Sequence, residues 1–71
     1  MLYQLRFFDA REIMARSLQI EADDESAAIR VGAIHCIECR MAVEVSTRNK
    51  YIVRITPLTA RLYLSGVSQG E

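Results

Sequence analysis

The segment ADDESAAIRVGAIHC, residues 22–36, carries the signals of a helix in the middle of a chain of 71 residues. Asp23 or Asp24 is placed to cap the start of this helix, because a short acidic side chain there accepts hydrogen bonds from the first backbone N–H groups. Glu25 adds negative charge beside the positive end of the helix dipole. We therefore predict a helix that begins near Asp24.

The predicted helix is apolar on almost all sides. Gly32 lies one turn from Ala28 and one turn from Cys36, so these residues form a flat strip suited to close packing. The remaining apolar residues form two stripes, one with Ala27, Val31 and Ile34 and the other with Ile29, Ala33, Cys36 and Ile37. A single sheet covers only one stripe, so we expect a second copy of the chain to cover the other.

The residues on both sides of the helix alternate between apolar and polar with a period of two. Before the helix, the alternating apolar residues are Tyr3, Leu5 and Phe7, then Leu18, Ile20 and Ala22 after a polar break at residues 9–12. After it, they are Met41, Val43 and Val45, then Tyr51, Val53 and Ile55 after a polar turn at residues 47–50. Each pair of runs predicts a β-hairpin.

The elements follow the order β-β-α-β-β. This order predicts an α+β fold, in which an antiparallel sheet of four or five strands has one helix packed on one face. Pro57 ends the fourth strand or places it at an edge, because proline cannot donate to a sheet ladder. Residues 58–64 alternate again and predict an optional fifth strand, paired within the chain or crossing to a neighbouring copy. We expect residues 1–64 to form a single domain and residues 65–71 a flexible tail.

Three parts of the chain carry a family resemblance: YxLxFFD at residues 3–9, DDxxAAI at residues 23–29, and EV at residues 44–45 followed by IVRI at residues 52–55. Together they resemble a group of short uncharacterised bacterial proteins that is common in alphaproteobacteria. Its members often have a tryptophan after the glutamate of the third strand, where this chain has Val45. The resemblance implies a β-β-α-β-β fold and carries over no activity, catalytic residue or binding residue.

The sequence HCIECR, residues 35–40, brings His35, Cys36 and Cys39 within five positions. Two cysteines at this spacing are typical of a redox dithiol or of half a zinc site, which needs a fourth ligand. They fall at the C-terminal end of the predicted helix, where the dipole disfavours a thiolate. We therefore predict two small buried core cysteines and no metal or cofactor. A zinc or redox site at these three residues is the second alternative.

The charges of the chain cancel, with nine basic and nine acidic residues, so no net field attracts it to nucleic acid or to a membrane. Five basic residues are nevertheless placed to share the sheet face that the helix leaves uncovered: Arg6, Arg16, Arg48, Lys50 and Arg54. Aromatic residues among them would give a stacking surface for single-stranded nucleic acid. A weak nucleic-acid-binding domain is therefore the first alternative function.

The leading prediction is a non-enzymatic, homo-oligomeric protein-interaction module. The sequence shows no catalytic signature, no secretion signal and no apolar segment long enough to span a bilayer, so we expect a cytoplasmic location and no membrane partner. We expect self-association into a homodimer or a higher oligomer, and an unknown protein partner. Nucleic acid is not the partner that we favour.

Overall fold

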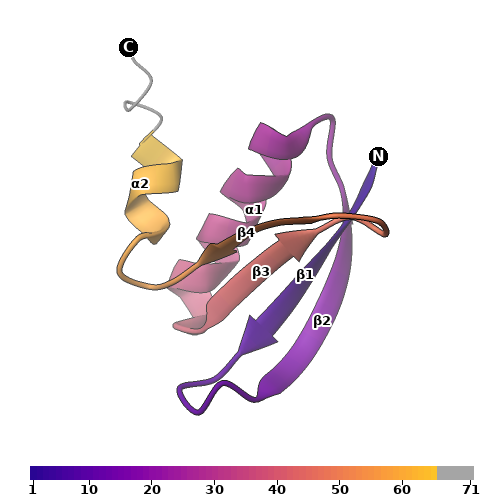
Figure 1. Cartoon of the computed structure of the whole chain (residues 1–71). Coiled ribbons are helices and arrows are strands. Elements are labelled where there is room, and N and C mark those ends of the chain that lie inside the picture. Colours follow the sequence, from indigo (N-terminus) through magenta and orange to yellow (C-terminus); the bar gives the residue numbers. More distant parts are fainter. Residues whose placement is uncertain (66–71) are drawn as a thin grey trace.

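The computed structural model describes residues 1–65, which form one antiparallel sheet and two helices. The elements are β1 (Leu2–Phe8), β2 (Met14–Glu21), α1 (Glu25–Cys39), β3 (Ala42–Ser46), β4 (Tyr51–Ile55) and α2 (Ala60–Ser65). The strand order is β2-β1-β3-β4, and α1 lies across one face of the sheet (Figure 1). The predicted α+β fold, with the order β-β-α-β-β and a helix on the sheet, is confirmed.

Local hydrogen bonds close both ends of α1. Asp24 has an extended backbone, and its Oδ1 accepts a hydrogen bond from the backbone N–H of Ala27 at 2.9 Å. At the other end, Arg40 takes a left-handed backbone with φ 58°, and its N–H donates to the carbonyl of Cys36 at 2.8 Å. These contacts satisfy backbone groups that lack partners within the helix. The helix thus begins at the predicted cap.

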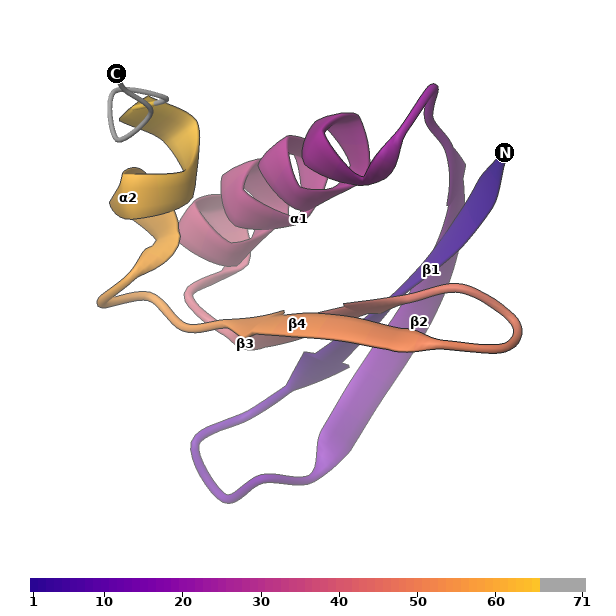
Figure 2. The same ribbon diagram turned by 45° about the horizontal axis from the view of Figure 1, so that its top comes forward.

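The core lies between α1 and the face of the sheet that α1 covers, which we call the helix side (Figure 2). Its largest fully buried side chains are Phe7, Leu5, Ile55, Val43, Val45 and Cys36. Gly32 allows the close approach, because a Cβ built there would lie 3.0 Å from Cγ2 of Val45 and 3.4 Å from Cδ1 of Ile55. The flat strip predicted around Gly32 is therefore the contact between helix and sheet.

Residues 58–64 do not form the fifth strand that their alternation predicted. From Ala60 onward they belong to α2, which packs against α1 on the side away from β2 (Figure 1). Ala60 is fully buried, and Tyr63 and Leu64 are half-buried against the core. These three residues have the spacing of one helix face, so the segment fits a helical period as well as an alternating one. Contact with α1 decides in favour of the helix.

The start of α2 is fixed by two threonines. The backbone N–H of Thr56 donates to the hydroxyl of Thr59 at 3.1 Å, and the N–H of Ala60 donates to the carbonyl of Thr56 at 2.9 Å. Except for Ser65, the last residue of α2, the predicted tail at residues 65–71 lies outside the described residues. In the described part of the chain, neither helix has the length and apolar character needed to cross a bilayer.

Candidate functional site

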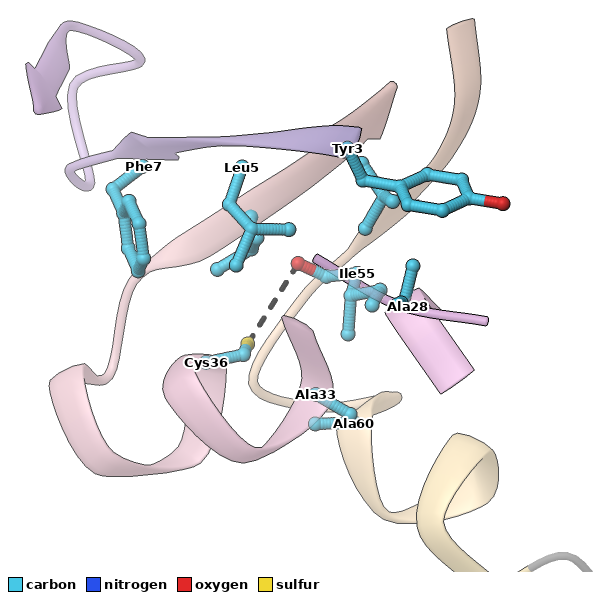
Figure 3. Packing of buried hydrophobic residues seen from close by; sticks show 11 residues of the cluster. Tyr3, Leu5, Phe7, Ala28, Ala33, Cys36, Ile55 and Ala60 are labelled. Carbon is cyan, nitrogen blue, oxygen red and sulfur yellow. Dashed lines mark hydrogen bonds between the residues drawn. The ribbon is translucent and has the colours of Figure 1, made fainter. Parts of the chain in front are cut away.

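Cys36 and Cys39, the two cysteines of the HCIECR segment, have different surroundings. Cys36 is fully buried, and its Sγ donates a weak hydrogen bond to the carbonyl oxygen of Ile55 at 3.7 Å (Figure 3). Burial raises the pKa of the Cys36 thiol, and the neighbouring Cys39 raises it further. Cys39 is exposed, because it is the last residue of α1 and adjoins the exposed turn at Arg40. The prediction of two buried core cysteines is thus confirmed for Cys36 and wrong for Cys39.

His35 packs against an aromatic ring of the core. Its ring meets that of Phe7 edge-on, with the centroids 5.8 Å apart. The guanidinium carbon of Arg16 lies 4.6 Å from the centroid of the same Phe7 ring. Within residues 1–65, no group of three or more His, Cys, Asp or Glu side chains is arranged to hold a metal. The zinc form of the second alternative therefore finds no assembled ligand set in this part of the chain.

The five basic residues predicted on one sheet face are divided between its two sides. Arg16 is paired with Phe7 across β1 and β2, so its side chain lies on the helix side. Arg6, Arg48 and Lys50 instead line a hollow on the outer face, the face opposite α1. The prediction that Arg16 shares a face with them is wrong. The sequence indicated the face of Arg16, because residues 16, 18 and 20 are alternate residues of one strand. Such residues lie on the same face, and residues 18 and 20 are apolar.

Arg54 also lies on the outer face, but two carboxylates bind it. Its Nη1 donates to Oε2 of Glu44 at 3.1 Å, and its Nη2 donates to Oε1 of Glu12 at 2.6 Å. The guanidinium carbon lies 5.3 Å from the centroid of the Phe8 ring. Arg54 thus joins β4 to β3 and to the β1–β2 loop, and its charge is already compensated.

The hollow on the outer face has a volume of about 660 Å³ and lies between β1, β2 and the β3–β4 loop. Its lining includes the two guanidinium groups together with amide and hydroxyl side chains: Arg6, Arg48, Gln4, Gln19, Ser17 and Ser46. None of the described residues that line it is acidic. The hollow is therefore a polar site with positive charge.

The helix side of β2 forms a second candidate surface. Three side chains make up this β2 surface: Arg16, Leu18 and Ile20, which the register places on the same side as Phe7, Leu5 and Tyr3 of β1. Leu18 keeps 36% of its surface exposed, and Ile20 is half-buried. On α1, one of the two predicted apolar stripes also keeps accessible surface, since Val31 is half-buried and Ile34 is exposed. Apolar side chains of both elements thus remain open to solvent.

Comparison of the chain with models of protein families, with curated proteins and with solved structures gave no match. The resemblance to the short bacterial proteins therefore stays a prediction. The β2 surface and the outer-face hollow are thus the two candidate sites of the described chain.

Proposed function

We propose that this protein is a cytoplasmic, non-enzymatic, homo-oligomeric interaction module whose subunits meet along β2. The observation that carries the proposal is the exposure of this strand. Seven of its eight residues are exposed and the other, Ile20, is half-buried. Yet Leu18 and Ile20 lie on the same face as the buried core residues of β1. Apolar side chains in this position gain stability only when another surface covers them.

The free edge of β2 favours a second copy of the chain as the partner. Among the described strands, only β1 pairs with β2, so the other edge presents open backbone groups. Residues 16–21 contain neither lysine nor proline, two residues that commonly protect an edge strand. A twofold axis perpendicular to the sheet would place two such edges side by side and antiparallel. The same symmetry would bring Leu18 and Ile20 of the two copies together.

The C-terminal segment plays no part in this proposal. Residues 58–64 were predicted to be able to cross to a neighbour as a strand, but residues 60–64 form part of α2. This helix covers the side of α1 that contains Ala33 (Figure 3). What remains for a second copy is the β2 surface with the stripe of α1 that contains Val31 and Ile34.

Light scattering after size exclusion tests the proposal. At micromolar concentration we expect a mass of at least twice the 8.1 kDa of one chain. Leu18→Lys places a charge in the apolar contact and should return the mass to that of one chain. Leu58→Lys is the matched control, since it makes the same substitution at a leucine that is 94% exposed in the loop between β4 and α2, outside β2. It should keep the oligomer.

Two results would overturn the proposal. The first is a wild-type chain that stays monomeric across the micromolar range. The second is an oligomer that survives Leu18→Lys unchanged, which would place the contact away from β2. Circular dichroism of each variant shows whether the fold is kept.

A further inference from the structure

Part of the Arg6 guanidinium has no hydrogen-bond partner within residues 1–65. Arg6 lies in β1, an inner strand of the sheet, and its side chain is half-buried. Among the described residues, its Nε is buried and has no hydrogen-bond partner. Glu44 is directly opposite on β3, but its carboxylate accepts a hydrogen bond from Arg54 instead. A partly desolvated guanidinium without an acceptor is costly, and this cost is removed when an anion binds.

A second arginine faces the same hollow. Arg48 lies in the exposed β3–β4 loop and lines the hollow together with Arg6. Lys50 lines it as well, but its Nζ is 3.2 Å from Oε2 of Glu25, so part of its charge is compensated. Arg6 and Arg48 therefore supply most of the positive charge.

The other polar residues of the lining suit a phosphate group, and Leu2, Tyr3, Leu18 and Tyr51 form its apolar part. Gln4 and Gln19 offer amide N–H donors, and Ser17 and Ser46 offer hydroxyls. Two guanidinium groups bind phosphate through several parallel hydrogen bonds, which a carboxamide or hydroxyl alone does not match. A volume of about 660 Å³ falls in the range of sites for small ligands. We propose that this hollow binds the phosphate of a small phosphorylated molecule, with Arg6 and Arg48 as its cationic contacts.

This site borders the proposed contact between subunits, because Leu18 of the β2 surface is also one of its lining residues. Its two cationic contacts do not belong to that surface, since Arg6 alternates with Leu5 in β1 and Arg48 lies in the β3–β4 loop. Arg6→Gln and Arg48→Gln therefore test the binding of phosphate without changing a residue of the β2 surface.

Titration of the ¹⁵N-labelled chain by NMR tests the site, with inorganic phosphate and thymidine monophosphate as the probes at constant ionic strength. We expect saturable shifts at the amides of Arg6, Ser17 and Ser46. Arg6→Gln and Arg48→Gln should each weaken binding about tenfold, the effect of losing a charge-assisted contact. Arg16→Gln is the matched control, because it removes the same charge from the helix side. It should bind as the wild type does.

Three results would overturn the proposal. The first is the absence of saturation, with shifts equal to those given by sodium chloride. The second is an equal loss in Arg16→Gln, which would mean attraction by net charge alone. The third is that an oligothymidylate of about 12 nucleotides binds tenfold or more tighter than the monophosphate, which would assign the hollow to a nucleic-acid strand. Arg48→Gln changes an exposed loop residue and decides the matter if Arg6→Gln disturbs the fold.

Discussion

The two edge strands of the sheet, β2 and β4, have similar apolar patterns but different surroundings. In β4, Ile55 is fully buried and Val53 is half-buried beneath α1. In β2, Leu18 is exposed and Ile20 is half-buried, although both lie on the helix side. The two helices lie toward the β4 end of the sheet, and β2 lies at the other end (Figure 2).

The difference follows from how much sheet a short chain can cover. A helix is about 10 Å wide and neighbouring strands are about 4.8 Å apart, so one helix covers roughly two strands. The sheet has four strands, and α2, with six residues, packs on the far side of α1 from β2. Among the elements of residues 1–65, no helix therefore covers the β2 end of the sheet. In a chain of this size, that end is where a partner gains the most.

The largest effect should be the difference in stability between variants of Leu5 and variants of Leu18, two residues that are directly paired across β1 and β2. Leu5 is fully buried, so Leu5→Ala should lower the free energy of unfolding by about 3 kcal/mol. Leu18→Ala should cost less than about 1 kcal/mol in the monomer, since that side chain is exposed. Urea denaturation at low protein concentration measures both. Equal losses would mean that β2 is covered as well as β1.

A substitution at Gly32 tests how closely α1 packs on the sheet. Gly32→Val should lower the free energy of unfolding by about 2 kcal/mol, because a Cβ there already lies 3.0 Å from Cγ2 of Val45 and the further methyl groups overpack the core. Ser26→Val, at an exposed position of α1, is the control for the effect of valine on the helix itself. Thermal unfolding followed by circular dichroism compares them. Similar losses in the two variants would contradict the tight contact.

The regular parts of the fold could be predicted from the sequence because each shows one clear period. The helix has a cap at Asp24 and a packing strip at Gly32, and the strands alternate over five residues or more. Residues 58–64 could not be decided, since Leu58, Leu62 and Leu64 alternate while Ala60 and Leu64 also fit a helix turn. In this segment the contact with α1 determines the secondary structure, and the local sequence does not reveal that contact.

The candidate site was predictable in part for a similar reason. The parity of each strand indicates which face a residue occupies, and it would have separated Arg16 from Arg6 once the hairpin register was known. Parity does not show which arginine has a carboxylate beside it. Arg54 is bound by Glu44 and Glu12, while the Nε of Arg6 has no partner among the described residues, and this difference depends on distances between strands.

A smaller effect should appear in the pH dependence of stability. Because the pKa of the Cys36 thiol is raised by burial, the folded chain holds this proton more tightly than the unfolded chain does. The contribution of this thiol to the free energy of unfolding is fully present below the ordinary thiol pKa of about 9. It is lost as the pH rises toward the pKa of Cys36 in the folded chain. Chemical denaturation at several pH values up to that range measures the slope. Cys36→Ala should flatten it, whereas Cys39→Ser should flatten it only in part, because burial, the larger cause of the raised pKa, remains.

The smallest effect concerns Glu12, whose carboxylate ties the β1–β2 loop to Arg54 of β4 and so links the two ends of the sheet. The Glu12 side chain is 66% exposed, so this ion pair should be worth only about 0.5 kcal/mol. Glu12→Gln removes the charge and should lower the free energy of unfolding by about that amount. A loss of several times this size would mean that the link holds β2 in place.

Glu12→Gly separates the ion pair from the backbone at the same position. Glu12 has a φ of 66°, a left-handed conformation that glycine adopts without the cost paid by other residues. The glycine variant loses the ion pair but relieves this strain, which is worth about 1 kcal/mol. It should therefore be at least as stable as the wild type, and clearly more stable than Glu12→Gln, in the same urea experiment. If the glycine variant were less stable than Glu12→Gln, the backbone freedom that glycine adds would outweigh the relief of the left-handed conformation, and the hydrogen bonds from the N–H groups of Arg11 and Ile13 to Asp9 would not be enough to hold the loop.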